Sequence, residues 1–487
     1  MSPLPPIDRR TAIGVFLAWF AAACTSAEEA VTPTGGTSPS ATTTATPTTA
    51  EPAPAPTVPT TEVLEPLTAP PAELPPAAFG LGIASGEPDD ESVVLWTRLV
   101  GTLPDSFEIV WEIAEASDFT ALVATGVAVV TSEAGHSVRA VASGLAADRE
   151  YWFRFRAGDQ TSTIGRTRTM PNIADLRPIT LGVSSCQARE GGAWAAHGDL
   201  AVADVDVVIW LGDYIYGEHR TLDEYRAAYA AYRSDPLLQA SHAAHPWIVF
   251  ADDHEVANDY DASVDPARRA AAYRAWWENQ PTRLPPPDDE GHLGFQRSFT
   301  LGGSVHLVGL DVRQFAGGPA FLGEDQWQDL ESASGIEAGN TVVASPVLMS
   351  GIRDLDGESL LPYTIDSRPN ERARLAALLS TMPSPIIISG DLHTSLVADF
   401  SADPLDPTAA AVATEIMAPA ISSAFPERFA PLAPFLPLIN PQLRQVEVAN
   451  GWLELTLSAD QDPTAAFHFV DDITDPESSI TLRPIPL

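Results

Sequence analysis

The chain from residue 173 onward alternates continuous apolar runs with amphipathic stretches. The runs have the length and composition of strands buried on both faces, and they lie at 179–183, 205–211, 247–250, 305–310 and 386–388. Helices are predicted over 226–233, 266–277 and 369–379, the second opened by Asp265 as N-cap and Pro266 as first helical residue. Strands that alternate with helices predict an α/β domain over residues 173–487.

Shorter strands without intervening helices are predicted between residues 79 and 170. They lie at 93–96, 107–113, 137–141 and 151–155, each bounded by turn residues. Gly144 and Leu145, followed by Tyr151, resemble the tyrosine corner of a fibronectin-like sandwich. We therefore expect an N-terminal β-sandwich domain over residues 78–172, which acts as a scaffold for the α/β domain.

The first 24 residues have the pattern of a signal peptide. A charged start with Arg9 and Arg10 precedes an apolar run that is too short to cross a bilayer. The arginine pair resembles a twin-arginine export signal, and Ala22, Ala23 and Cys24 resemble a lipobox, in which Cys24 becomes the acylated first residue. The alternative is an ordinary secretion signal with an incidental cysteine. We expect an exported bacterial protein, either a cell-envelope lipoprotein or extracellular, whose only membrane contact is a lipid anchor at Cys24.

Residues 25–77 consist mostly of Ala, Thr, Pro and Ser, a composition that cannot bury a core. We expect a disordered tether here. About fifty such residues span on the order of 40 Å as a flexible chain, enough to hold the folded domains away from a membrane.

The charge of the chain excludes several classes of partner. The formal net charge is -38, and every basic residue is arginine. A nucleic-acid-binding surface needs the opposite sign, and so does attraction to an anionic membrane. The absence of lysine excludes a Schiff-base lysine and the lysine of a P-loop.

The chain has two cysteines, Cys24 and Cys186. If Cys24 is acylated, Cys186 has no disulfide partner, so the stability of the fold depends on a large core. We expect a monomer.

Polar clusters follow most of the buried strands of the α/β domain, at 184–186, 212–216, 252–255, 311–313 and 390–393. In α/β sheets the ligand crevice lies outside the carboxyl ends of the strands, so these segments are expected to meet. Their carboxylates would repel one another strongly in one cleft unless cations neutralised them. Each cluster alone also fits a turn, a helix start or a buried small side chain, but the recurrence of one arrangement after successive strands indicates a metal site.

These motifs resemble the PhoD-like alkaline phosphatase and phosphodiesterase group of the calcineurin-like metallophosphoesterases. The resemblance covers about residues 78–470 and is carried by the segments 82–99, 185–187, 212–216, 252–258, 310–313, 389–395 and 419–423. It implies a PhoD-like N-terminal domain followed by an αββα metallophosphoesterase sandwich.

The resemblance also implies a site for Fe3+ and Ca2+. Its implied iron ligands are Cys186, Asp213, Tyr216 and His393. Asp213 would bridge to calcium, which Asp253 and Asp391 would also bind. The donor types suit these metals, because thiolate and phenolate are strong donors for a highly charged iron and calcium prefers carboxylate oxygens.

Three further residues receive roles from the same resemblance. His254 would face the leaving group, Asn258 would contact the phosphate or a metal, and Arg189 is a candidate for a phosphate contact. Asp259 departs from the family pattern, in which a second asparagine follows the first. The segment before Pro281 departs as well, because a methionine is expected there.

We expect hydrolysis of phosphate esters by attack of a metal-bound hydroxide, as in alkaline phosphatase D-like enzymes. One alternative is a phosphodiesterase of phospholipase D type that acts on lipid or cell-wall phosphodiesters. Another is a non-catalytic exported binding module with a vestigial metal site. A serine hydrolase that uses Ser184 or Ser185 lacks the glycines of a nucleophile elbow.

Overall fold

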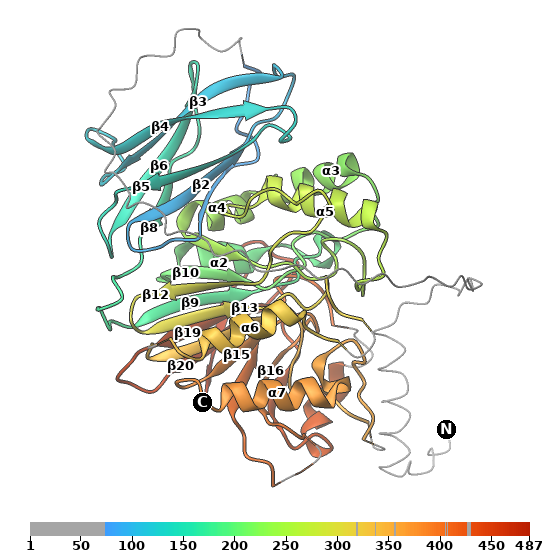
Figure 1. Ribbon diagram of the computed structural model, residues 1–487. Coiled ribbons are helices and arrows are strands. Elements are labelled where there is room, and N and C mark those ends of the chain that lie inside the picture. The colour runs from blue at the N-terminus through green and yellow to red at the C-terminus, as the bar shows by residue number, and fades with distance from the viewer. Residues whose placement is uncertain are drawn as a thin grey trace, which may run out of the picture.

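The computed structural model describes residues 74–487 apart from 318–319, 337, 355–356, 405, 407 and 426–429 (Figure 1). The predicted signal peptide, and the predicted tether up to residue 73, lie outside the described residues. Leu74 already packs in a hydrophobic core, four residues before the predicted boundary at residue 78. No helix in the described part of the chain is long and apolar enough to cross a membrane.

Two large sheets form the centre of the molecule. The nine-stranded sheet contains, in spatial order, β21 (Ile480–Ile485), β20 (Thr464–Val470), β19 (Gly451–Leu457), β9 (Ile179–Ser184), β10 (Val207–Trp210), β11 (Pro246–Val249), β1 (Ile83–Gly86), β2 (Ser92–Arg98) and β5 (Ser137–Ser143). The seven-stranded sheet contains β12 (Arg297–Leu301), β13 (Val305–Gly309), β14 (Asn340–Ser345), β15 (Ile386–Ser389), β17 (Ala413–Met417), β16 (Ser395–Phe400) and β18 (Leu443–Glu447).

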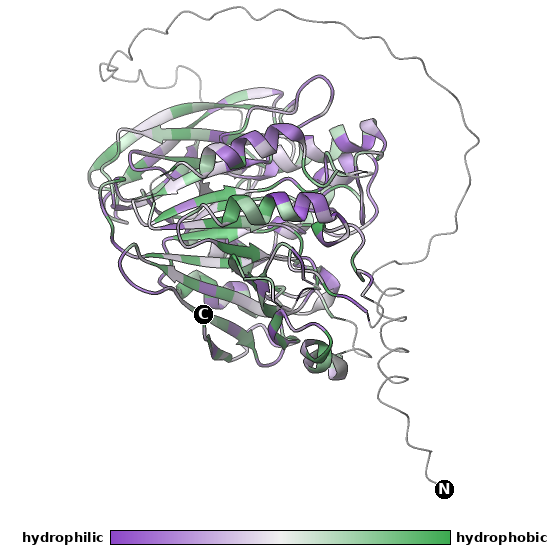
Figure 2. Ribbon diagram, turned by 60° about the horizontal axis from the view of Figure 1, so that its bottom comes forward, coloured by the Kyte–Doolittle hydropathy of each residue, from purple (hydrophilic) through white to green (hydrophobic). Residues whose placement is uncertain are grey.

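The two sheets pack face to face, and helices cover their outer faces. One apolar core draws on strands of both sheets, from Val183 and Leu453 in the first to Leu307 and Ile388 in the second. Outside the first sheet lie α2 (Ala195–Val202), α3 (Leu222–Arg233), α4 (Pro236–Ala244) and α5 (Pro266–Asn279), and outside the second lie α6 (Glu324–Ala333) and α7 (Pro369–Leu379). Figure 2 shows the apolar strands inside and polar helix faces outside. This is the expected αββα arrangement. Short 3-10 helices complete it: η1 (Arg189–Gly191), η2 (Ile365–Ser367) and η3 (Ala430–Leu438).

Three of the described α-helices, α3, α4 and α5, begin at residues whose side chains cap them. Asp265 accepts the Ala267 N–H and Pro266 begins α5, as predicted. Helix α3 begins at Leu222, earlier than the predicted residue 226, because Thr221 and Glu224 form a reciprocal capping box. The predicted strands are present with small differences at their ends, whereas β1, β12, β14 and β16 to β21 of the two large sheets were not predicted from the sequence.

The N-terminal part is a two-layer sandwich that shares one layer with the α/β part. Its outer sheet contains β4 (Leu122–Thr131), β3 (Ser106–Ala114), β6 (Glu150–Ala157) and β7 (Gln160–Thr161), with β8 (Gly165–Arg168) paired to β6. The other layer is β1, β2 and β5, and β1 pairs in parallel with β11 of the central sheet. Tyr151 Oη accepts the Ala146 N–H at 2.9 Å, the hydrogen bond of a tyrosine corner. The likeness to a fibronectin domain stays a prediction.

Candidate metal centre

The candidate ligands meet where the parallel strands end. Strands β9, β10 and β11 run in parallel, as do β13, β14 and β15 in the second sheet. Cys186 follows β9, Asp213 follows β10, Asp253 follows β11 and Asp391 follows β15. The sandwich of two sheets therefore brings residues that lie as much as 205 positions apart to one edge, as ligand crevices of α/β sheets require.

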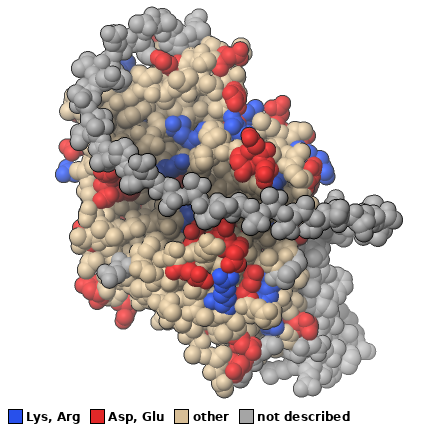
Figure 3. All heavy atoms as spheres, viewed as in Figure 1, with Lys and Arg blue, Asp and Glu red and all other residues tan. Residues whose placement is uncertain are grey.

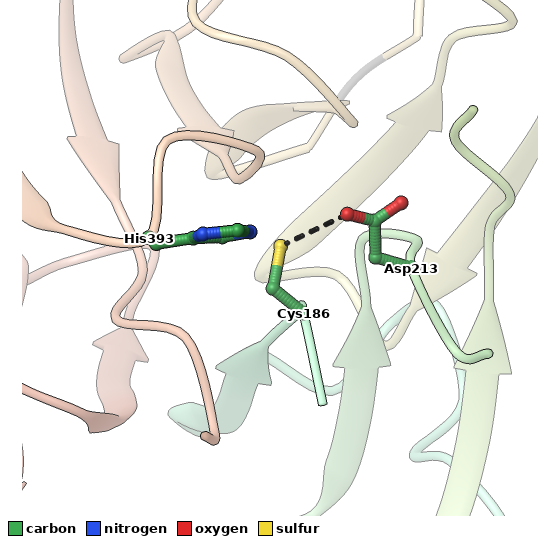
Figure 4. Close-up of side chains that lie close together, drawn as sticks. All are labelled: Cys186, Asp213 and His393. Carbon is green, nitrogen blue, oxygen red and sulfur yellow. Dashed lines mark hydrogen bonds between the residues drawn. The ribbon is translucent and has the colours of Figure 1, made fainter. Parts of the chain in front are cut away.

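Cys186, Asp213, Tyr216 and His393 form one half of this edge, which we call the mixed-donor half. Figure 4 shows the Cys186 thiol pointing between the Asp213 carboxylate and the His393 ring. Cys186 Sγ lies 3.5 Å from Asp213 Oδ2, and Tyr216 Oη donates to the same oxygen at 2.7 Å. His393 Nε2 lies 3.1 Å from Tyr216 Oη. A thiol, a carboxylate, a phenol and an imidazole thus converge on one point.

The tautomer of His393 follows from its second hydrogen bond. His393 Nδ1 lies 3.2 Å from the carbonyl oxygen of Ala424, which can only accept, so Nδ1 carries the proton. Neutral His393 then directs the lone pair of Nε2 toward the other candidate metal ligands, as a metal-binding histidine does. Burial lowers the pKa of His393 to about 4, which favours this neutral form.

Asp252, Asp253 and Asp391 form the other half, which we call the acidic half. One carboxylate oxygen from each lies within 4.8 Å of the others. Asp213 takes part in the mixed-donor half with Cys186 and His393, and also in a second group with Asp253 and His254. Its carboxylate therefore lies between the two halves.

Electrostatics shows that the acids need compensating charge. Burial raises the pKa of Asp213 well above its usual range, and Asp253 and Asp252 raise it further. Burial and Asp252 also raise the pKa of Asp391. Burial likewise raises the pKa values of the Cys186 thiol and the Tyr216 phenol. Thiol, phenol and carboxyl groups release their protons in such a place when cations replace them, so the donor set fits bound metal ions.

Glu255 joins the two loops that carry Asp213 and Asp253. Its fully buried carboxylate accepts the N–H of Asp213 at 3.0 Å, of Tyr214 at 2.5 Å and of Asp252 at 2.8 Å. The loop after β10 is thus fixed to the loop after β11. The sequence motif 252–255 contained this residue, but its role depends on the contact between the two loops.

The three residues with predicted roles toward the substrate, His254, Asn258 and Arg189, lie in surroundings that differ from one another. The His254 ring packs on Tyr216, with ring centroids 4.1 Å apart, so it lies at the mouth of the mixed-donor half. Asn258 is exposed and donates to Asp259 Oδ2 at 2.7 Å. Arg189 is exposed above the Tyr232 ring, 5.9 Å from its centroid, and within the described part of the chain it makes no hydrogen bond or ion pair with a candidate ligand.

Two residues without a predicted role contact the acidic half. Arg313 donates from Nε to Asp252 Oδ1 at 2.6 Å. Tyr363 Oη donates to Asp391 Oδ2 at 2.6 Å. Arg313 carried a sequence signal, because it follows a buried strand. Tyr363 carried none, since it lies in the long connection between β14 and α7.

Comparison with known families and proteins agrees with this architecture. The family model described as "PhoD-like phosphatase" matches residues 181–431, and the model described as "PhoD-like phosphatase, N-terminal domain" matches residues 66–171. Alkaline phosphatase D of Bacillus subtilis (strain 168) is 30% identical over 384 residues, which are 67% of this chain and 66% of the Bacillus protein. The chain thus matches just under two thirds of that relative's length.

Solved structures show the same fold. A structure of PhoD superposes with a TM-score of 0.78 at 27% identity, covering 87% of this chain and 94% of that one. A purple acid phosphatase from yellow lupin (Lupinus luteus) seeds superposes with a TM-score of 0.54 at 12% identity, covering 82% of this chain and 73% of that one, a likeness of fold alone. With one family model matching more than half of its residues, this chain belongs to the PhoD-like phosphatase family.

Proposed function

We propose that this protein is an exported, metal-dependent phosphatase of the alkaline phosphatase D type. The observation that carries the proposal is the position of Asp213, whose carboxylate is shared between a mixed-donor half and an acidic half. A carboxylate in this position would help to hold both cations of a two-metal site, the kind of site at which metal-assisted phosphoryl transfer takes place. The Bacillus relative that bears the name alkaline phosphatase D supports the same activity.

In this proposal the two halves hold different metals. The thiol, phenol, imidazole and carboxylate of the mixed-donor half suit iron(III), with Cys186, Asp213, Tyr216 and His393 as ligands. The carboxylates of Asp213, Asp253 and Asp391 suit calcium. Bound cations would activate water as hydroxide near neutral pH and neutralise the phosphate oxygens.

The protein's own residues would act around that centre. Burial lowers the pKa of His254, whose ring packs on Tyr216 at the mouth of the site. His254 would donate a hydrogen bond or proton to the leaving oxygen of the ester. Arg189 and Asn258 would contact the phosphate if their exposed side chains turn toward it when substrate binds.

We further propose export to the cell envelope, with Cys24 as the only membrane anchor, and action as a monomer. The signal-peptide pattern of residues 1–24 supports export. Globomycin-sensitive processing or metabolic labelling with a fatty acid would test acylation of Cys24, with Cys24→Ala as the control.

The decisive experiment measures hydrolysis of a phosphate monoester and a matched diester by the purified full chain, with and without chelator. We expect chelator-sensitive turnover that returns when iron and calcium are restored, and the monoester should be the better substrate. Asp213→Asn should lower kcat by at least about a hundredfold, because losing a ligand costs no less than losing its supporting contacts. Asp261→Asn is the matched control, because Asp261 is an exposed aspartate in a nearby loop.

The outcomes separate the competing functions. A strong preference for the diester would assign the protein to the phosphodiesterase class instead. No turnover of either ester by protein that contains both metals would contradict catalysis and favour a binding module. Turnover by Asp213→Asn within tenfold of the unmutated protein would contradict the assigned site.

A further inference from the structure

Arg313 is a buried cation inside the acidic half of the candidate metal centre. It follows β13 of the seven-stranded sheet, and its side chain is 4% exposed. Its Nε donates to Asp252 Oδ1 at 2.6 Å. Asp252 precedes Asp253 in the chain, so this ion pair fixes the loop after β11 from the opposite sheet. The acidic half is therefore held from both sheets.

The far end of the guanidinium faces two candidate ligands at once. Arg313 Nη2 lies 3.7 Å from Asp253 Oδ1 and 3.8 Å from Asp391 Oδ1. Nη2 is buried and, within the described residues, makes no hydrogen bond. It attracts both carboxylates without occupying their lone pairs, which leaves their oxygens available to a metal ion.

A second contact supports the same arrangement. The Arg313 guanidinium lies over the Tyr363 ring, 5.1 Å from its centroid. Tyr363 donates to Asp391 Oδ2 at 2.6 Å, which fixes the oxygen of Asp391 that Arg313 does not face. Arg313 and Tyr363 together thus define the orientation of the Asp391 carboxylate.

The contacts of Arg313 belong to one half of the centre. They reach Asp252, Asp253, Asp259 and Asp391, the last of these from β15. Across the described part of the chain, no hydrogen bond or ion pair joins Arg313 to Cys186, Tyr216 or His393 in the mixed-donor half. A change at Arg313 can therefore act on the two halves unequally.

We infer that Arg313, held in place by Asp252, is a positioning residue for the acidic half of the centre, which would bind calcium. It does not position the mixed-donor half, which would bind iron. The inference rests on the proposed function. Residues that support metal ligands typically contribute tenfold to a hundredfold in metal affinity. A guanidinium suits this role because its planar fork can face several carboxylates in fixed directions.

The sign of the effect distinguishes positioning from simple charge. A cation close to a calcium site repels calcium, so a residue that acted only through its charge would weaken calcium binding while present. Removing it would then tighten binding. A residue that positions the carboxylates has the opposite effect, because its removal lets Asp253 and Asp391 turn away from the metal and from each other.

The test compares calcium affinity and iron-site absorption in the full-length holoprotein. Calcium affinity is measured by calorimetric titration of calcium chloride into calcium-depleted, iron-loaded protein. The iron half is followed by the charge-transfer absorption of a tyrosinate bound to iron(III), which reports Tyr216. Arg313→Gln should weaken calcium binding by about tenfold or more and leave this absorption unchanged.

A double variant guards against failure to fold. Arg313→Gln alone leaves the Asp252 carboxylate buried and unpaired, which is strongly destabilising. Asp252→Asn/Arg313→Gln removes both charges and should fold, and because Asp252 belongs to the acidic half, it is compared with Asp252→Asn alone, relative to which it should bind calcium about tenfold or more weakly. Arg372→Gln is the matched control, because Arg372 is equally buried and pairs with Asp366 away from the centre. It should leave calcium affinity unchanged.

Each outcome decides the matter. Calcium binding in the double variant as tight as in Asp252→Asn alone, or tighter, would overturn the inference, and so would a loss of the iron absorption together with calcium. Weakened calcium binding in Arg372→Gln would overturn it too, because the effect would then follow from loss of any buried arginine. If the unmutated protein showed neither iron absorption nor calcium binding, the proposed function would fail instead.

Discussion

At the scale of single residues, four of the six candidate ligands occupy an uncommon backbone conformation. Cys186, Asp213, Asp391 and His393 have φ angles of 56°, 59°, 80° and 52°. This left-handed region costs non-glycine residues on the order of 1 kcal/mol or more, and such residues cluster at functional sites. The positive φ turns each side chain sharply at the end of its strand. Surrounding hydrogen bonds must therefore hold these loops in place.

Glu255 provides the clearest example of such support, and Glu255→Gln tests it. An amide places a nitrogen where a carboxylate oxygen now accepts a backbone N–H, so at least one of the three hydrogen bonds is lost. We expect the free energy of unfolding to fall by about 2 kcal/mol. We also expect the iron-to-protein ratio to fall, because Asp213 loses its support. Denaturant titration and elemental analysis measure the two effects.

Glu371→Gln is the matched control for this change. One oxygen of Glu371 accepts the N–H groups of Phe321 and Leu322, at 2.8 and 3.1 Å, far from the metal centre. Its amide can keep an oxygen in that position, so stability should change little and metal content not at all. Equal losses in both variants would contradict a special role for Glu255.

At the scale of elements, α2 is attached to the outer face of the first sheet by one polar cluster. Asp199 on α2 accepts from Trp452 Nε1 at 2.8 Å and lies 3.0 Å from His468 Nδ1. His468 Nε2 lies 3.5 Å from Glu454, and its ring stacks on Trp452 with centroids 3.8 Å apart. The charge of one histidine thus contributes to the contact between a helix and two strands, β19 and β20.

This cluster predicts a pH dependence of stability. Burial lowers the pKa of His468, but the hydrogen bond with Asp199 and the nearby carboxylate of Glu454 outweigh burial and hold the pKa above its ordinary value. A raised folded-state pKa gives stability that is complete below the unfolded value, about 6.5, and is lost as pH rises through the folded value. The stability advantage of the unmutated protein over His468→Gln should therefore be largest below about pH 6.5 and decline above it.

Denaturant midpoints of the two proteins, measured at several pH values between about 5.5 and 8.5, test this dependence. A difference that does not vary with pH would contradict a charged His468. A difference that grows with pH would reverse the sign and contradict the raised pKa.

At the scale of the whole molecule, the N-terminal sandwich and the α/β layers are continuous. Strand β1 pairs with β11 in parallel and with β2 antiparallel, so one sheet runs through both parts. Buried contacts reinforce this junction, since Trp96 on β2 donates from Nε1 to the Glu278 carbonyl at 2.9 Å.

On the face shown in Figure 3, acidic and arginine side chains lie near one another, consistent with the many arginine ion pairs.

A continuous sheet predicts one cooperative unfolding transition. A Cβ added at Gly86 on β1 would lie 2.4 Å from the Pro281 carbonyl oxygen and 2.6 Å from that of Trp247. Gly86→Ala should therefore destabilise the protein by about 1–3 kcal/mol and lower the midpoint of the single transition. Differential scanning calorimetry measures it.

Gly198→Ala is the control for Gly86→Ala. Gly198 lies within helix α2, and a Cβ added there would lie 3.4 Å from the side chain of Leu237, so it should be tolerated. Two separate transitions, or a shift in only one of them, would show that the sandwich unfolds independently and contradict the prediction.

The sequence by itself determined several of the buried strands and the polar clusters at their ends. Both follow from local patterns, because period and apolar length define a strand and the next few residues must turn. The clusters that contain Cys186, Asp213, Asp253, Asp391 and His393 were identified in this way, and the family resemblance then selected these residues as candidate ligands.

The tertiary structure alone decided how those ends meet. No local pattern encodes the pairing of β1 with β11, the addition of β19 beside β9, or the reach of Tyr363 to Asp391. Such contacts join residues far apart in sequence, and many partners would satisfy the same local pattern. Register and sheet order are fixed only when the two sheets pack on one core, which also decides that Arg313 faces the acids from the opposite sheet.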